Sequence, residues 1–389
     1  MVGFILIYKK LGMLPLETMI FMRMALILFL AMFVCVPLPA HADTVDELTG
    51  RLQKVLDEKV SDSTVTPGAS LCVILPNHEI VSLASGKNKR GKGGQSLTTS
   101  DNFRIASMTK TFIAAVSLML EENSSLRLKS RARRYLKDVV DFDRVPNGKK
   151  VTVRHLLAMK SGIPDYLDTE GFDEVYSSNP HHRWTAKETI EMVYDLSPKF
   201  SPGQKFFYSN TNYTMMGKIL SRVMHKRLST LMRELLFDPL ELSDTFVEFE
   251  ASTRSLSTHG YEYDDNKRLK DVTDYNDGLG LGDGGIISTP SDVARFLLAL
   301  FIDQTVLSEE SLDKMTRFGA ESDYGLGVER VMTDFGETWT HSGASSGFQG
   351  EYYYFPDSGL IWVLLTNSFE TDLIEPVFSQ TMPIILEYR

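Results

Sequence analysis

Strand-like segments occur near both ends of this chain, and mostly helical patterns fill the space between them. The strand-like runs cover 69–75 and 79–83 around a turn, and then 339–342, 348–355 and 360–366. Helical patterns cover 44–58, 109–122, 152–160, 186–196, 212–236 and 371–388. Strands must share a buried layer with partners. The pattern therefore predicts one sheet built from both termini, with a helical insertion beside it at about 111–280.

The first 42 residues have the pattern of a secretory signal. Arg23 precedes an apolar run from Met24 to Leu38, and the small-residue cleavage site Ala40-His41-Ala42 follows. The run is shorter than the roughly 20 residues of a membrane span, so we expect a cleaved signal, with an uncleaved anchor as the alternative. The expected mature unit is 43–389, periplasmic or secreted. Met13, Met19 and Met22 stay open as the true start.

Composition narrows the classes of function. The formal net charge is −10, and an acidic chain is a poor candidate for binding nucleic acid. Two cysteines, Cys35 and Cys72, exclude a disulfide framework and a cysteine-rich metal site. Cys35 would leave with the signal, whereas Cys72 lies in an apolar run where a buried strand residue is expected. We expect no metal or other cofactor, and no stable membrane insertion after signal cleavage.

The sequence Ser107-Met108-Thr109-Lys110 stands at the start of a predicted helix. An i, i+3 spacing places the Ser hydroxyl and the Lys amine on one helix face. A serine becomes a nucleophile when a base takes its proton, and a lysine held away from water can be that base. The N–H groups of a helix N-terminus also favour a developing oxyanion. A second copy, Ser311 to Lys314, lies beside two glutamates and is interpreted as a surface helix face.

Tyr208-Ser209-Asn210 follows a loop signal and precedes a helix. Residues i and i+2 of an extended segment point the same way, so the phenol and the carboxamide should face one cleft. The phenol could pass on a proton, and the carboxamide could hold a substrate amide. The alternative is a helix cap beside a buried tyrosine.

His341-Ser342-Gly343 lies on a predicted strand near the C-terminus. A glycine on an edge strand lets a ligand approach the backbone closely. The next N–H, from Ala344, could then donate to an oxyanion.

These three elements follow one another in the order S-x-x-K, Y-x-N and H-x-G. The chain thereby resembles the serine penicillin-recognising family of class C β-lactamases, secreted D-alanyl-D-alanine carboxypeptidases and related esterases. The resemblance spans roughly 46–385. The flanking segments that carry it are FRIASMTKTF, VTVRHLLAMKSGIPDY, FSPGQKFFYSNTNYTMMGKIL, GDGGIISTPSDVARF and HSGASSGFQGEYYYFP. The fold it implies is a two-lobed α/β (α+β) fold, in which an antiparallel sheet flanked by helices lies beside an all-helical lobe.

The resemblance also implies roles for individual residues. Ser107 would be the nucleophile that forms an acyl-enzyme, while Lys110 and Tyr208 share the acid and base work. Asn210 would bind the acyl amide, and the backbone N–H groups of Ser107 and Ala344 would form the oxyanion hole.

Two departures from the family pattern concern the substrate end. His341 stands where many members carry the lysine of K-T-G, so attraction of a substrate carboxylate is expected to be weaker and pH-dependent. Ala344 lacks the hydroxyl that some peptidase members carry after the glycine, although Ser342 keeps one beside Gly343. These residues form the expected substrate-binding strand.

Other mechanisms have weaker support. Residues 343–347 match the nucleophile elbow G-x-S-x-G, but that fold needs a later histidine and His341 is the last one. A zinc hydrolase could use His155 or the pair His181-His182, yet adjacent histidines point apart and no H-E-x-x-H occurs.

The first-ranked function is a D-alanyl-D-alanine carboxypeptidase-like activity on cell-wall peptides. A carboxylesterase and a β-lactamase follow, and a non-catalytic penicillin-binding-like sensor or scaffold is the further alternative. The expected partner is a small-molecule or peptidoglycan-peptide substrate. The oligomeric state stays open.

Overall fold

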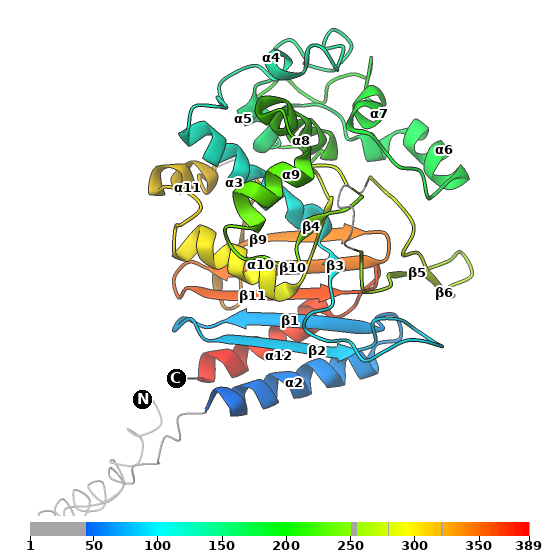
Figure 1. Ribbon diagram of the computed structural model, residues 1–389, viewed down its shortest axis with the longest axis vertical. Coiled ribbons are helices and arrows are strands. Elements are labelled where there is room, and N and C mark those ends of the chain that lie inside the picture. The colour runs from blue at the N-terminus through cyan, green and yellow to red at the C-terminus, as the bar shows by residue number, and fades with distance from the viewer. Residues whose placement is uncertain (1–43, 250–254, 279, 320–321, 389) are drawn as a thin grey trace, which may run out of the picture. The chain divides into compact units, whose positions relative to one another are not determined.

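Both ends of the described chain contribute to one six-stranded antiparallel sheet. The computed structural model describes residues 44–388, except 250–254, 279 and 320–321, so the predicted signal segment lies outside it. The strand order is β2-β1-β11-β10-β9-β8. The strands are β1 (Gly68–Ile74), β2 (Ile80–Gly86), β8 (Glu329–Thr333), β9 (Gly336–Ser345), β10 (Phe348–Phe355) and β11 (Leu360–Thr366). The predicted sheet built from both termini is confirmed (Figure 1).

The central strands β1 and β11 are buried along their whole length. Side chains alternate between the two faces, so Cys72 and Ile74 join the core on one face while Leu71 and Val73 join the core on the other. Helix α10 (Pro290–Leu297) contributes to the first of these cores. Cys72 is thus a buried strand residue, as expected, and burial raises the pKa of its thiol to about 11.

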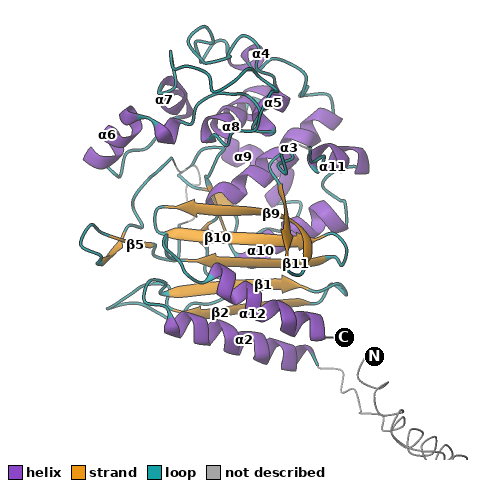
Figure 2. Ribbon diagram, turned by 180° about the vertical axis from the view of Figure 1, so that it is seen from behind, coloured by secondary structure: helices purple, strands orange, loops and turns teal. Residues whose placement is uncertain are grey.

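Two helices from opposite chain ends cover the other face of the sheet. Figure 2 shows α2 (Val45–Asp62) and α12 (Ile374–Glu387) against the strands. Helix α2 buries leucines at helical spacing, including Leu48 and Leu52. Phe378 of α12 packs edge-on against Trp362 of β11, with ring centroids 5.3 Å apart. Both helices form close to where the apolar spacing predicts them.

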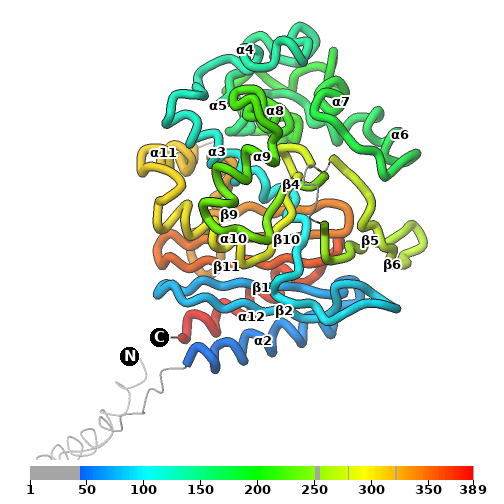
Figure 3. The backbone as a smooth tube through the Cα atoms, viewed as in Figure 1, coloured from blue at the N-terminus to red at the C-terminus, as the bar shows by residue number. Residues whose placement is uncertain are grey.

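The remaining helices between residues 109 and 232 gather beyond β9, on the side away from α2 (Figures 1 and 3). They are α3 (Thr109–Glu122), α4 (Arg133–Leu136), α5 (Val153–Leu157), α6 (Glu170–Ser178), α7 (Ala186–Glu191), α8 (Asn210–Met224) and α9 (Leu228–Met232). The limits of the predicted helical insertion, about 111 and 280, stay a prediction.

Several of these helices end earlier than the sequence pattern predicts. Met159 and Asp195 adopt positive φ of 53° and 61°, and a left-handed residue cannot continue a right-handed helix. The segment 212–236 divides for the same reason, because His225 ends α8 with φ 53°. A π-helical turn, Arg233–Phe237, follows α9.

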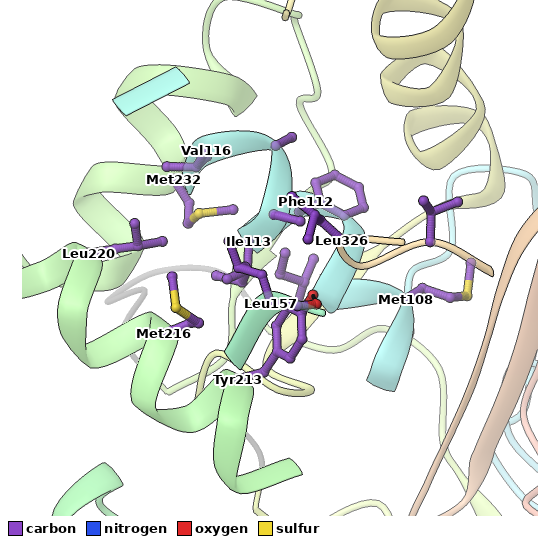
Figure 4. Packing of buried hydrophobic residues seen from close by; sticks show 14 of the residues in the cluster. Met108, Phe112, Ile113, Val116, Leu157, Tyr213, Met216, Leu220, Met232 and Leu326 are labelled. Carbon is purple, nitrogen blue, oxygen red and sulfur yellow. Dashed lines mark hydrogen bonds between the residues drawn. The ribbon is translucent and has the colours of Figure 1, made fainter. Parts of the chain in front are cut away.

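Helix α3 is the best-buried helix of this part and carries the first S-x-x-K at its N-terminus. Figure 4 shows Ile113 of α3 packed toward side chains of α8, including Tyr213 and Met216, while Phe112 lies beside Leu326. Phe112 also stacks on Phe296 of α10, with ring centroids 3.7 Å apart. This packing fixes α3 between the sheet and the other helices.

Short strands connect the segments that approach α3. A three-stranded sheet has the order β3 (Phe103–Arg104), β7 (Ile286–Ser288), β4 (Phe246–Val247). Arg104 makes a buried bidentate ion pair with Glu248, with distances of 3.0 and 2.8 Å. This sheet places the chain just before residue 106 beside the chain just after residue 283.

Two elements complete the described fold. The hairpin β5 (Tyr261–Tyr263) and β6 (Leu269–Asp271) forms a separate two-stranded sheet, and α11 (Glu309–Met315) precedes β8. Among the described residues, none of the helices combines the length and the apolar run that a bilayer crossing needs.

Candidate active site

Ser107 lies in a single 3₁₀ turn, η1 (Ala106–Met108), directly before α3. The preceding residue, Ala106, has a positive φ of 46°, which is costly for a residue with a Cβ. Strained backbone of this kind persists where the surrounding structure imposes it. The half-buried Ser107 side chain is thereby presented at the N-terminal end of a rigid, buried helix.

Lys110 is fully buried, one helical turn after Ser107. Its Nζ lies 2.8 Å from Ser107 Oγ, 2.8 Å from Asn210 Oδ1 and 2.7 Å from the main-chain oxygen of Asp283. An ammonium has three N–H donors, and all three have an oxygen acceptor here. The structure therefore brings Ser107 and Lys110 together, as their spacing predicts, and adds Asn210 to the same site.

Tyr208 and Asn210 approach Lys110 from the start of α8. The Tyr208 ring centroid lies 5.0 Å from Lys110 Nζ. Ser209 is extended, with φ −151° and ψ 118°, but Asn210 is already the first residue of α8. The two side chains face one site across the extended Ser209, as the sequence argument supposed, although Asn210 already belongs to the helix.

Gly343 lies where β9 passes η1. Strand β8 pairs with β9 only as far as Thr340, so within the described part of the chain no strand pairs with the last residues of β9 on that side. A Cβ on Gly343 would lie 2.2 Å from the Ile105 oxygen and 3.1 Å from the Ser107 nitrogen. The glycine is therefore required for close approach. It brings β9 at Gly343 against the Ser107 backbone, and the adjacent Ser342 and Ala344 are exposed.

His341 is buried and both of its ring nitrogens have partners within the protein. Nδ1 lies 2.7 Å from the Ser342 carbonyl oxygen, so Nδ1 carries the proton, and Nε2 then accepts from the Tyr324 hydroxyl at 3.2 Å. Burial, with the nearby Lys110 charge, lowers the pKa of His341 to about 3. The imidazole is neutral at physiological pH, so its charge does not vary there.

Two buried acids near Lys110 were not identified from the sequence. Asp165 Oδ2 accepts a hydrogen bond from Asn210 Nδ2 at 2.8 Å. The Asp283 carboxylate accepts from Tyr166 at 2.8 Å and from Thr214 at 3.0 Å. Burial raises the pKa of both carboxyls, that of Asp283 to about 6. Both acids lie in segments that carry the family resemblance, IPDY and GDGGIIS, but nothing in their spacing gives them a role.

The competing motifs do not form sites. Ser345 and Ser346 lie at the end of β9 and in the turn to β10, and not between a strand and a helix as a nucleophile elbow requires. His155 closes a capping box at the start of α5, whereas the His181 ring contacts the Asp274 carbonyl oxygen at 3.0 Å. These histidines serve separate local structures.

The second S-x-x-K copy differs in part from its prediction. Lys314 is partly exposed, as expected, and pairs with Glu310 and Glu121. Ser311 is buried, so the interpretation of this serine as part of a surface face is wrong. It lies on the inner side of α11, together with Leu312 and Met315.

Comparison with known proteins places this geometry in a family. The profile of the Beta-lactamase family matches residues 50–376. "Penicillin-binding protein 4*" of Bacillus subtilis (strain 168) is 28% identical over 293 residues, which cover 70% of this chain and 62% of that protein. "Penicillin-binding protein 4" of Amycolatopsis lactamdurans is 26% identical over 344 residues, covering 81% and 85%. The chain thus spans less than two thirds of the first of these relatives.

Solved structures agree in fold. A D-stereospecific amidohydrolase from Streptomyces sp. superposes with a TM-score of 0.73 at 26% identity, covering 85% of this chain and 97% of that one. A D-amino acid amidase from Ochrobactrum anthropi SV3, complexed with L-phenylalanine amide, gives 0.73 at 27% identity, covering 88% and 98%. The predicted fold and the predicted serine-hydrolase class are confirmed. This chain belongs to the Beta-lactamase family and is a serine hydrolase of that fold.

Proposed function

We propose that this chain is an exported hydrolase that cleaves amide bonds of D-configured amino-acid derivatives, cell-wall peptides among them, through an acyl-enzyme on Ser107. One observation carries the proposal: the buried Lys110 Nζ lies 2.8 Å from Ser107 Oγ, and its other two contacts are neutral oxygens. The names of the similar proteins, penicillin-binding proteins and D-amino acid amidases, support this substrate class.

Acylation follows from the position of Lys110. The amine, once neutral, takes the Ser107 hydroxyl proton while Oγ bonds to the substrate carbonyl carbon. The tetrahedral oxyanion lies against the N–H groups of Ser107 and Ala344, which the close approach at Gly343 brings toward one another. Breakdown expels the amine, which leaves with a proton. An ester then joins the acyl group to Ser107.

Tyr208 is placed to pass that proton to the leaving amine. Its ring centroid lies 5.0 Å from Lys110 Nζ, which puts the phenol in the same site; in the proposed step its hydroxyl gives a proton to the amine and takes the proton that Nζ received from Ser107. Deacylation runs the same path in reverse, with water in place of the amine. Asn210 Nδ2 uses one hydrogen on Asp165, and its second hydrogen remains for the substrate's acyl amide oxygen.

The state of His341 shapes the choice of substrate. A D-alanyl-D-alanine carboxypeptidase needs attraction for a terminal carboxylate, but His341 is neutral and both ring nitrogens are bonded within the protein. The exposed neighbour Ala344 adds no hydroxyl. We therefore expect amide-capped D-alanyl peptides to be cleaved at least as fast as the free acids. The proposed activity resembles that of a D-alanyl-D-alanine carboxypeptidase but does not require a terminal carboxylate on the substrate.

One comparison of substrates tests this function. Wild type, Ser107→Ala and the matched control Ser311→Ala are assayed on a D-alanyl-D-alanine peptide, its C-terminal amide, a chromogenic cephalosporin and a short-chain aryl ester. Loss of the nucleophile should lower all turnover by about 10,000-fold or more, with Ser311→Ala unchanged.

Each of the other possible results contradicts one part of the proposed function. Undiminished turnover by Ser107→Ala would falsify the mechanism. If only the free-acid peptide is cleaved, the proposal that no terminal carboxylate is needed is wrong. If the cephalosporin or the ester is cleaved fastest, the proposed amide substrate is wrong. A stable adduct on Ser107 without turnover makes the protein a sensor.

Export is the second part of the proposal, and it rests on Arg23, the apolar run and the Ala40-His41-Ala42 site. N-terminal sequencing of the protein recovered outside the cytoplasm should start at Asp43. Recovery of full-length protein in the cytoplasm contradicts it.

A further inference from the structure

Asp165 has no contact with Ser107 or Lys110 that would make it a catalytic residue, yet it is nearly fully buried beside them. Its Oδ2 accepts from Asn210 Nδ2 at 2.8 Å, and Oδ1 accepts from the Leu167 N–H at 3.2 Å. Asn210 in turn contacts Lys110 through its oxygen at 2.8 Å. A continuous chain of hydrogen bonds thus leads from Asp165 to Ser107.

We propose that Asp165 is a positioning residue, which fixes the side-chain amide of Asn210 so that only its oxygen faces Lys110. An ionised carboxylate is acceptor-only, so the atom that Asn210 turns toward it must be the NH₂ group. The amide oxygen is then left for Lys110, which as an ammonium is donor-only.

The consequence concerns the lone pair that Lys110 needs as a base. A neutral amine has two N–H donors and one lone pair. Two of its three partners, Asn210 Oδ1 and the Asp283 carbonyl oxygen, can only accept. Both N–H groups are therefore used there, and the lone pair can face only the Ser107 hydroxyl. With the Asn210 amide reversed, its NH₂ would compete with Ser107 for that lone pair.

The surrounding backbone makes Asp165 a fixed reference point. Ser209 and Thr211, on either side of Asn210, both donate their hydroxyls to the Pro164 carbonyl oxygen, at 3.0 and 2.8 Å. The Tyr166 N–H donates back to Thr211 Oγ1 at 3.0 Å. The segment 164–166 is thereby fastened to the start of α8. The Asn210 amide is the one part of this contact that can still rotate.

The titratable groups that face Lys110 come from four further segments. They are the phenols of Tyr208 and Tyr213, the imidazole of His341 and the carboxyls of Asp165 and Asp283. Of these, Asp165 contacts Asn210, a side chain that does not titrate and that touches Lys110 through its oxygen. A change at Asp165 should therefore act through the orientation of Asn210.

The test uses Asp165→Asn, with Asp168→Asn as its control. Asp168 is exposed, three residues away in the turn η2 (Tyr166–Asp168). An amide at 165 offers one oxygen in place of two. With that oxygen kept on the main-chain N–H of Leu167, its NH₂ opposes that of Asn210, and the rotatable Asn210 amide reverses. In the double variant Asp165→Asn with Asn210→Asp, the NH₂ group at position 165 donates to the carboxylate at position 210. The other carboxylate oxygen at position 210 still faces Lys110.

The readout is the rate at which a fluorophosphonate labels Ser107, followed by intact mass from pH 5 to 10. This reagent reports activation of the serine without any assumption about the natural substrate. The maximal labelling rate of Asp165→Asn should fall about 10- to 100-fold, because the reversed Asn210 amide draws the Lys110 lone pair away from Ser107. The pH at which labelling is half-maximal should move down, because an NH₂ group then faces Lys110. The double variant should recover most of the rate. Its half-maximal pH should move up, because a carboxylate now contacts Lys110.

Asp168→Asn should match wild type, and circular dichroism confirms folding of each variant. An unchanged Asp165→Asn rate, or a double variant as slow as the single, overturns the positioning role while leaving the proposed function intact. A wild type that is not labelled contradicts the proposed function itself, on which this inference rests.

Discussion

The two S-x-x-K sequences of this chain have the same spacing and opposite surroundings. Lys110 is fully buried, and the three atoms within hydrogen-bond distance of its Nζ are neutral oxygens. The Lys314 side chain is 29% exposed, and its Nζ lies 3.0 Å from Glu310 and 3.5 Å from Glu121. These carboxylates raise the pKa of Lys314, and the largest cause is the hydrogen bond that the ammonium donates to Glu310.

A base must give up its proton before it can take another. Carboxylates in contact with Lys314 stabilise the ammonium and keep that proton in place. Neutral acceptors hold Lys110 in position without adding a full opposing charge at contact distance. Spacing along a helix therefore decides only that Ser and Lys can meet, whereas the partners decide whether the lysine can act as a base.

Removing the Lys110 amine should give the largest effect among the variants that test this difference between Lys110 and Lys314. Lys110→Met keeps the length and apolar character of the buried stem but leaves Ser107 without a base. The rate of acylation should fall about 100- to 10,000-fold, the usual contribution of general base catalysis. Burst kinetics with an aryl ester measure that step. A variant within a few-fold of wild type would show that another group activates Ser107.

The sequence identified this pair because its geometry is local. An i, i+3 spacing and a predicted helix start are properties of four consecutive residues, and α3 begins at Thr109 as predicted. The predicted sheet also formed, since continuous apolar runs such as β11 need burial on both faces.

The contacts that separate Lys110 from Lys314 are not local. Asp165 and Asp283 reach the site through segments 55 and more than 100 residues away from Lys110, and no periodicity encodes that approach. The buried side of Ser311 was misjudged for a related reason. The inner face of a short helix depends on what packs against it.

The approach of β9 is a second feature that Ser107 has and Ser311 lacks. Gly343→Ala would place a Cβ 2.2 Å from a main-chain oxygen, so η1 and β9 must separate. We expect turnover to fall about 100-fold or more, as for loss of an oxyanion-hole donor. The free energy of unfolding should drop by about 1–3 kcal/mol, typical of overpacking.

Gly50→Ala is the matched control for that glycine. Gly50 lies within α2, and an added Cβ there meets nothing within 4 Å. Alanine should stabilise this helix by about 0.5–1 kcal/mol and leave turnover unchanged. Steady-state kinetics and urea unfolding measure both variants. Equal effects at the two glycines would mean that close approach at Gly343 is unimportant.

The pH dependence of stability tests whether the charge of Lys110, and not that of Lys314, acts on His341. Burial, and then the Lys110 charge, lower the pKa of His341 from 6.5 to about 3. Between these values the unfolded chain binds a proton that the folded chain does not, so the free energy of unfolding falls as pH falls through this window. Lys110→Met removes one cause and should lose less stability between pH 7 and 5 than wild type.

Two variants complete that measurement by urea unfolding at pH 7 and 5. His341→Gln removes the titrating group and should also show a smaller loss. Lys314→Met, far from the imidazole, should keep the wild-type difference. Loss of the Lys110 charge also lets the Asp283 pKa rise further, which acts in the same direction. Identical pH dependence in wild type and Lys110→Met would contradict the coupling between Lys110 and His341.

Lys314→Met should give the smallest effect, and it tests the other half of the contrast. The ammonium is partly solvated and its two ion pairs, to Glu310 and Glu121, are of the kind that contributes about 0–1 kcal/mol. The stem can still cover the same apolar surface of α11, so unfolding should change by less than about 1 kcal/mol. Acylation of Ser107 should not change, because the partners of Lys314, Glu310 and Glu121, are different from the three partners of Lys110. Glu121 of α3 contacts Lys314, so a slower acylation in this variant would mean that the Lys314 charge affects Ser107 through α3. The surroundings of Lys110 and Lys314 would then not be independent.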